Sequence, residues 1–166
     1  MKSKVFWVVV VLGLLGAAMY AGSVLATPSS GVSTTIYGQS SFSDIDVNAH
    51  SIPADIWQAK VKTKGQSDVY VVDNKLAVGG TTGWHTHPGP SLILVVQGSV
   101  TNYTSSDPTC AGQTYTAGQG FIDPGQGEVH TLRNEGSVVA ETIAVQLLPK
   151  GAVRKTDEPV PDNCPF

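Results

Sequence analysis

Three histidines in two separate stretches are the residues best suited to chemistry. His85 and His87 lie two positions apart in GWHTHPG, just before the apolar run 91–97, and His130 lies in GEVHTLRN. Side chains two positions apart in an extended strand point to the same face, so the ring nitrogens of His85 and His87 can converge on one ion. This spacing predicts a site for a divalent transition metal (Zn, Fe, Mn, Cu or Ni), with His130 as a candidate third ligand.

Other polar residues near these histidines are candidates for the same site. Glu128 lies two residues before His130 and shares its face if that segment is extended, so its carboxylate could bind the metal, orient a water or act as a catalytic base. The alternative is a solvated carboxylate at the rim. Ser91 and Gln97 have the same parity in the apolar run, which makes both candidates for lining a cavity, although Gln97 could equally end the strand facing water. His50 is assigned to hydrogen-bonded structure.

The elements that position these residues are predicted to be short strands. The chain has 18 Gly and 10 Pro among 166 residues, and they separate short runs rich in Val, Ile and Thr. About eight such runs with turn residues between them are typical of an all-β sandwich or barrel. Gly98-Ser99 follows the apolar run and predicts a tight hairpin there. We therefore expect one domain, over residues 52–149, with a single core.

Both ends of the chain differ from this central region. Residues 1–26 begin with two lysines, continue as an uncharged apolar run and end in small residues, which is typical of a secretory signal peptide. The alternative is a retained signal anchor, in which residues 5–25 span a membrane. Residues 27–51 are rich in Ser, Thr and Gly and are predicted to be a polar linker or loosely attached arm.

The charge and the cysteines limit the partners and the compartment. A net charge of −3 gives no electrostatic basis for binding nucleic acid. In an exported chain the two cysteines, Cys110 and Cys164, are expected to form a disulfide that holds the tail 150–166 as a C-terminal strap. Two free buried thiols are the alternative. The expected location is therefore secreted or otherwise extracytoplasmic, with membrane attachment only if the N-terminal segment is retained.

The spacing of the histidines resembles the two signature motifs of the cupin superfamily. The first motif is matched, with five, three and six intervening residues, by Gly79, the His85-Thr86-His87 triplet, Ser91 and Gly98. The second is matched in order by Gly118, Pro124, Gly127, His130 and Asn134. There are two departures: one extra residue lies between Pro124 and Gly127, and Ser91 stands where metal-binding cupins usually carry a glutamate ligand.

This resemblance implies a small antiparallel jelly-roll barrel with a metal held by His85, His87 and His130. It also implies a dioxygenase or related oxidoreductase acting on a small organic substrate. The alternative is a non-catalytic cupin that binds a small molecule or sugar, and Ser91 favours it because the usual carboxylate ligand is missing. Cupins often pair through sheet faces, so a homodimer is compatible with the resemblance, but nothing in the sequence selects a face.

Overall fold

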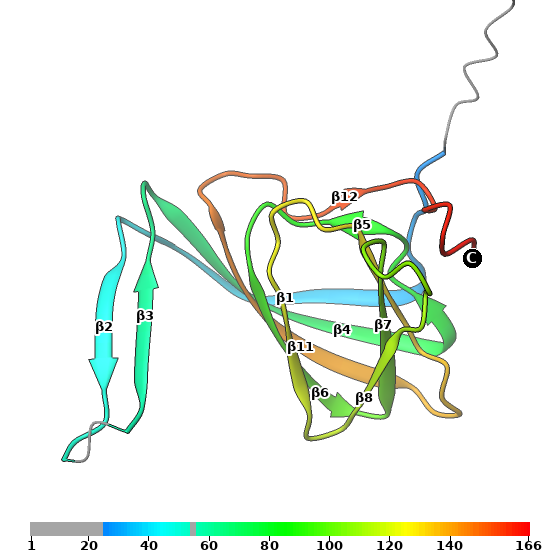
Figure 1. The fold of residues 1–166 in the computed structure, drawn as a ribbon, viewed down its shortest axis with the longest axis horizontal. Coiled ribbons are helices and arrows are strands. Elements are labelled where there is room, and N and C mark those ends of the chain that lie inside the picture. Colours follow the sequence, from blue (N-terminus) through cyan, green and yellow to red (C-terminus); the bar gives the residue numbers. More distant parts are fainter. Residues whose placement is uncertain (1–24, 54–55) are drawn as a thin grey trace, which may run out of the picture.

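The computed structural model describes residues 25–53 and 56–166, which form twelve strands and no helix (Figure 1). The strands are β1 (Ser30–Phe42), β2 (Asp46–His50), β3 (Gln58–Lys62), β4 (Ser67–Thr81), β5 (His85–Thr86), β6 (Ser91–Gln97), β7 (Ser99–Thr104), β8 (Gln113–Thr116), β9 (Gly120–Asp123), β10 (His130–Arg133), β11 (Ala140–Pro149) and β12 (Thr156–Asp157). The all-β class predicted from the sequence is therefore confirmed.

Ten of these strands form one antiparallel sheet that curves back on itself. The long strand β4 pairs with β1 and β11, and β6 and β9 continue the sheet beyond β11. β10 links the two faces, because it pairs with β4 as well as with β5 and β7. Beyond β10, β12 pairs with β5 and β8 pairs with β7. The result is a nearly closed jelly-roll barrel with one interior.

The interior has an apolar part made of two clusters. The first contains Tyr70, Val72, Ile93, Ala144 and Leu148. The second contains Leu76, Val95, Val100, Leu132 and Ala140. These side chains come from β4, β6, β7, β10 and β11, so both faces of the barrel contribute to the core. Burial of this apolar surface is the main force that closes the barrel.

The N-terminal boundary of the domain differs from the prediction. The composition of residues 27–51 predicts a loose arm, whereas Ser30–Phe42 form β1, which pairs with β4 from Ser67 to Thr81. Most β1 side chains are exposed, because this strand lies at the edge of the sheet. An edge strand needs few apolar residues, and its Thr and Ile residues suit extended backbone. The prediction of a loose arm is therefore wrong for Ser30–Phe42.

β2 and β3 form a separate two-stranded hairpin that stands away from the barrel (Figure 1). Its large apolar side chains are exposed, including Trp57 at 59%. Across residues 25–53 and 56–166 there is no helix of the length and apolar character needed to cross a membrane. The signal segment predicted over residues 1–26 lies almost wholly outside the described residues.

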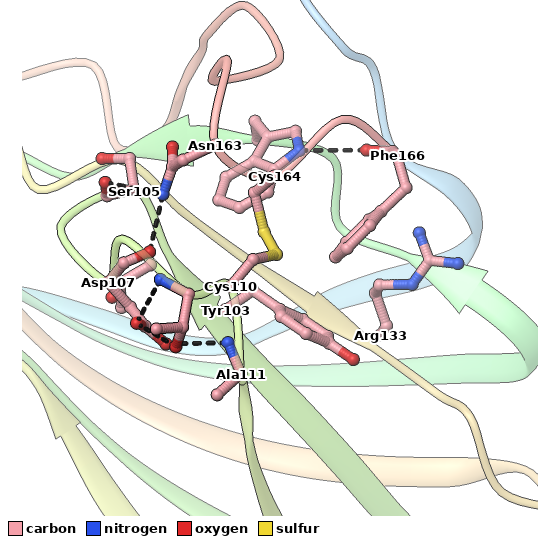
Figure 2. The surroundings of a disulfide bond; sticks show 12 residues. Tyr103, Ser105, Asp107, Cys110, Ala111, Arg133, Asn163, Cys164 and Phe166 are labelled. Atoms are coloured by element: carbon pink, nitrogen blue, oxygen red, sulfur yellow. Dashed lines mark hydrogen bonds between the residues drawn. A yellow bond between two sulfur atoms is a disulfide. The ribbon is translucent and has the colours of Figure 1, made fainter.

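The predicted disulfide between Cys110 and Cys164 is present (Figure 2). Its two Cα atoms are 5.3 Å apart, within the usual range for this bond. Next to it, the Asn163 amide donates to the carbonyls of Ser105 and Asp107, as Figure 2 shows. The bond therefore fixes the end of the strap 150–166 to the loop that follows β7.

Further contacts fix the strap to the strand that carries His85. Thr156 and Asp157, which form β12, pair with Thr86 and His85 of β5. Trp84, only 1% exposed, donates from its indole N–H to the carbonyl of Phe166. The strap is therefore part of the structure that positions the histidines.

Candidate metal centre

Three histidine side chains meet in the interior of the barrel. β5 begins at His85, His87 follows β5 directly, and His130 begins β10, where it pairs in register with His85. The three residues are between 4% and 9% exposed. One ring nitrogen from each lies within 4.8 Å of the others, and the Nε2 atoms of His85 and His87 are 3.2 Å apart. The two predicted motifs thus place their histidines at one point.

Backbone carbonyls orient each of the three imidazoles. The Nδ1 atoms lie 2.7 Å from the carbonyl oxygen of Gly83 for His85, 2.6 Å from that of Arg154 for His87, and 3.0 Å from that of Glu128 for His130. A carbonyl only accepts, so in each ring Nδ1 carries the proton and Nε2 carries a lone pair. This is the arrangement of metal-binding histidines, in which the second nitrogen is held by a hydrogen bond.

The spacing of the nitrogens fits a metal ion. With Nδ1 protonated, His85 and His87 direct two Nε2 lone pairs at each other across 3.2 Å, which is repulsive without a cation between them. Two nitrogens that each lie about 2.1 Å from one ion are roughly 3.0–3.4 Å apart at angles of about 90–110°. The observed separation falls in this range. The side chains present therefore suit a divalent transition metal.

Burial favours the neutral form of the His85 and His87 imidazoles, which is the form that binds metal. Removal from water, followed by the neighbouring imidazoles of His130 and His87, lowers the pKa of His85 from 6.5 to about 2. Removal from water also lowers the pKa of His87, although its hydrogen bond to the Arg154 carbonyl opposes this effect. At neutral pH these two rings do not have to lose a proton before they can bind an ion.

A carboxylate that the sequence did not indicate also faces the histidines. Asp123 ends β9 and is 5% exposed. Its Oδ2 atom lies 4.0 Å from Nε2 of His87 and 3.9 Å from Nε2 of His130. Its Oδ1 atom accepts a hydrogen bond from the backbone N–H of Gly125. β9 pairs with β6 so that Asp123 is directly opposite Ser91, a cross-strand relation that cannot be read from either motif.

The histidines line a cavity of about 70 Å³ inside the barrel. Ser91, 1% exposed, lies in its wall and accepts a hydrogen bond from Nε2 of Gln146. Oε1 of Gln146 in turn accepts from the guanidinium of Arg154, which reaches the cavity from the strap. Ser91 thus lines the cavity, as expected for one of its two candidates. It is the first member of a hydrogen-bonded chain that continues through Gln146 to the guanidinium of Arg154.

Comparison with known proteins gives the same architecture. No protein-family profile matches the sequence. Among solved structures, the chain is similar to peruvianin-I, titled a cysteine peptidase from Thevetia peruviana latex, with 23% identity over 78% of this chain and 68% of that one and a TM-score of 0.50. It is also similar to a cupin superfamily protein from Desulfitobacterium hafniense, with 13% identity over 68% and 79% of the two chains and a TM-score of 0.42. The chain therefore shares the fold of peruvianin-I, an antiparallel β-barrel.

A curated sequence relative matches part of the same chain. The auxin-binding protein ABP20 of Prunus persica is 41% identical over 71 residues, which are 42% of this chain and 33% of that protein. The match thus spans about a third of the length of this relative. A cupin domain of an XRE-family transcriptional regulator from Enterobacter cloacae is similar in structure, with 19% identity over 49% of this chain and 83% of that one and a TM-score of 0.41.

The last residue of the second cupin motif, Asn134, has a structural role here. It is 1% exposed, and its amide donates to the carbonyls of Leu76 and Val138 while its Oδ1 accepts from the N–H of Gly136. These bonds hold the turn after β10 against β4. Asn134 therefore supports the strand that begins with His130.

Gln97, one of the two candidates for lining the cavity, does not line it. Gln97 is exposed and donates to the carbonyl of Val139, because an irregularity where β6 pairs with Glu141 and Thr142 breaks the alternation that would have turned it inward. Gln97 therefore takes the second of the two placements that the sequence leaves open, at the end of the strand facing water. His50, which the sequence assigns to structure and not to the site, is exposed at the end of β2, in a two-stranded sheet separate from the sheet that carries the three histidines.

Glu128 is also placed differently from the prediction. It precedes β10 rather than belonging to it, after a turn in which Gln126 and Gly127 have positive φ, so the alternation of an extended strand does not apply. Its carboxylate accepts a hydrogen bond from Ser106 and lines a separate surface depression. The proposed role as metal ligand or base is therefore not supported by its position. Its backbone carbonyl, however, orients His130.

Proposed function

We propose that the protein is an exported metal-dependent cupin oxidoreductase, of the dioxygenase type, that acts on a small organic substrate. The observation that carries this proposal is the convergence of three buried imidazoles whose Nδ1 atoms are all held by carbonyls. His85, His87 and His130 would hold a divalent transition metal. When bound, such an ion supplies Lewis acidity and coordination positions that a substrate can occupy.

The chain itself supplies a dry, oriented environment for this chemistry. The cavity wall opposite the histidines is apolar where Val72, Ile93 and Phe121 line it, which keeps bulk water from the reacting groups. The carbonyls of Gly83, Arg154 and Glu128 hold the protons on Nδ1, so the Nε2 atoms remain free to bind. The barrel therefore orients the three imidazoles toward one point before an ion enters.

The size and charge of the cavity support a small anionic substrate. A volume of about 70 Å³ corresponds to roughly five or six water-sized positions, which suits a compound of a few heavy atoms better than a sugar. Arg154 is half-buried at the cavity, and no carboxylate in the described part of the chain forms an ion pair with it. Its guanidinium is suited to bind a carboxylate through two parallel hydrogen bonds.

Export and self-association are further parts of the proposal. The disulfide between Cys110 and Cys164 supports an oxidising compartment, and the N-terminal pattern over residues 1–26 supports export. The outer face of β6 exposes Leu92, Leu94 and Val96 at 54%, 50% and 49%. Such a row of apolar side chains supports a homodimer through this face.

Metal analysis of protein exported and purified without chelators tests the proposed function. We expect about one equivalent of a transition metal per chain for the wild type, and loss of that metal for the His85→Ala/His87→Ala double variant. A His50→Ala variant is the matched control, because this imidazole lies on the hairpin outside the site. Metal-free wild-type protein from metal-replete medium would contradict the proposal, as would equal metal in the double variant.

A non-catalytic binding protein is the second candidate function. The observation that favours it is Ser91, because its hydroxyl is committed to Gln146 and is a poor metal ligand. A panel of small carboxylic and hydroxy acids, tested with metal-loaded protein, separates the two candidates. Turnover of any member supports the oxidoreductase, whereas saturable binding by calorimetry with no turnover on the whole panel supports the binding protein.

A further inference from the structure

We propose that Asp123 supplies the carboxylate ligand of this metal site, from β9, in place of the glutamate that metal-binding cupins usually carry at the position of Ser91 on β6. The inference rests on the proposed metal-binding function, and it adds to that function a ligand at a position that neither signature motif specifies. Its basis is the position of one buried carboxylate oxygen relative to two of the three histidines.

Register explains how the carboxylate can move from one strand to the next. Ser91 of β6 and Asp123 of β9 are directly opposite each other in an antiparallel pair. Directly opposite side chains lie on the same face of the sheet, with Cβ atoms about 4.5–5.5 Å apart. Both residues line the cavity of the histidines. A side chain at position 123 therefore reaches the same part of the cavity as a longer side chain at position 91.

The distances place Asp123 close to a ligating position. Oδ2 is 4.0 Å from Nε2 of His87 and 3.9 Å from Nε2 of His130. Two ligand atoms of one ion, each about 2.0–2.2 Å away from it, are roughly 3.0–3.5 Å apart at angles of about 90–110°. Oδ2 needs to approach each nitrogen by less than about 1 Å to meet this condition, which a small side-chain rotation provides.

The environment of Asp123 leaves this oxygen without any other partner. Oδ2 is buried and accepts no hydrogen bond, whereas Oδ1 of the same group accepts from the Gly125 N–H. Within residues 25–53 and 56–166 no Lys or Arg forms an ion pair with Asp123, and Oδ2 lies within 4.0 Å of Nε2 of His87 and His130. A buried carboxylate without a cation or donor is costly. An ion at the three histidines removes that cost.

Hydrogen bonds to the histidines do not satisfy Oδ2. The Nδ1 protons of His87 and His130 are already donated to the carbonyls of Arg154 and Glu128. In the tautomer that these carbonyls select, each Nε2 offers a lone pair and is an acceptor, as Oδ2 is. Two acceptors and one carboxylate oxygen facing the same point are a ligand set that a cation completes. Three imidazoles and one carboxylate give a mixed N and O set that suits first-row divalent metals.

The test measures the affinity of the folded protein for Zn²⁺ and Co²⁺ by competition with a chromophoric chelator. The first variant, Asp123→Asn, keeps the Oδ1 acceptor for Gly125 but removes the charge, so the loop after β9 keeps its hydrogen bond. We expect its affinity to fall about 100-fold or more, beyond the roughly 10–100-fold typical of residues that only support a ligand. The visible spectrum of bound Co²⁺ should change as well.

Two further variants control this experiment. Asp73→Asn is the matched control, because Asp73 is also buried and also has one oxygen without a hydrogen bond, but it does not line the cavity of the histidines. Its metal affinity should equal that of the wild type. The exchange variant Ser91→Glu/Asp123→Ser returns the carboxylate to β6, and it should regain an affinity within about tenfold of the wild type. It also serves if Asp123→Asn does not fold.

The outcomes separate this inference from the proposed function. If wild-type protein binds neither Zn²⁺ nor Co²⁺, the metal site itself is refuted and Asp123 loses its role with it. If the wild type binds both ions and Asp123→Asn stays within threefold with an unchanged Co²⁺ spectrum, only the role of Asp123 is overturned. A large loss in Asp123→Asn with full retention in Asp73→Asn supports it.

Discussion

Removal of the disulfide should weaken both the barrel and its metal site. The bond joins Cys110 to Cys164 across 54 residues of sequence, and the strap that it anchors supplies the Arg154 carbonyl to His87. For a loop of this length, loss of the cross-link costs about 4 kcal/mol at 25 °C by the chain-entropy model. In a domain of this size that corresponds to a fall in Tm on the order of 10–20 °C.

The effect on the metal site follows from the position of the strap. β12 pairs with the strand that begins at His85, and Arg154 holds the proton on Nδ1 of His87. Loosening of the strap removes a partner that orients one imidazole. Loss of such a partner typically lowers metal affinity about 10–100-fold. We therefore expect the Cys110→Ala/Cys164→Ala variant to bind Zn²⁺ more weakly by that factor at 25 °C, where it is still folded.

The assay has two parts. Thermal unfolding in the presence of a chelator gives the Tm of the metal-free protein, and competition with a chromophoric chelator at 25 °C gives its Zn²⁺ affinity. Val100→Ala is the control, because Val100 is fully buried in the core but does not line the cavity of the histidines. It should lower Tm through the cavity that it creates and leave metal affinity unchanged. The reasoning is refuted if the cysteine variant melts within about 2 °C of the wild type, or if its Zn²⁺ affinity matches that of Val100→Ala.

Three further predictions concern charge and surface. Hydrogen bonds from Ser41 and from the Gly151 N–H lower the pKa of Asp68, so its contribution to stability is present above pH 3.8 and is lost as pH falls through the lowered pKa. The Tm difference between the wild type and Asp68→Asn should therefore be large at pH 6 and vanish in strong acid. A difference that stays constant with pH contradicts this prediction. Arg154→Ala should weaken the binding of small carboxylates by about tenfold or more. Its Zn²⁺ affinity should stay unchanged, because the backbone carbonyl of residue 154 still accepts from Nδ1 of His87. Carboxylate binding that calorimetry finds unchanged contradicts an anion site at Arg154. Leu94→Asp on the exposed face of β6 should convert a dimer to a monomer in light scattering, and a wild-type monomer at high concentration rules out this interface.

Local patterns in the sequence predict the histidines well, because their relation is set within one strand. His85 and His87 share a face through the two-residue period alone, and the glycine and proline spacing marks the strands on either side. The same reasoning fails where an alternation is interrupted. The irregularity in β6 turns Gln97 outward, and the turn before β10 directs the Glu128 carboxylate to Ser106 and not to the cavity of the histidines.

Pairing between distant segments explains the remaining differences. Asp123 meets Ser91 only because β9 pairs with β6 in one particular register, which no local pattern specifies. The only local signal is a carboxylate at the end of an apolar FID triplet just before Pro124, within the second motif. Gly98-Ser99 predicts a hairpin between β6 and β7. Instead, β6 pairs with β9 and β11, and β7 pairs with β8 and β10. This turn therefore connects opposite sides of the barrel.

Anomalous diffraction from crystals grown with Zn²⁺ tests the central claim most directly. We expect one strong peak at the zinc edge inside the barrel, within about 2.0–2.2 Å of Nε2 of His85, His87 and His130. The same data recorded below the edge should lose this peak, which identifies the ion. Zinc bound only at surface sites, with the three Nε2 atoms linked to water alone, would contradict the metal centre described for this barrel.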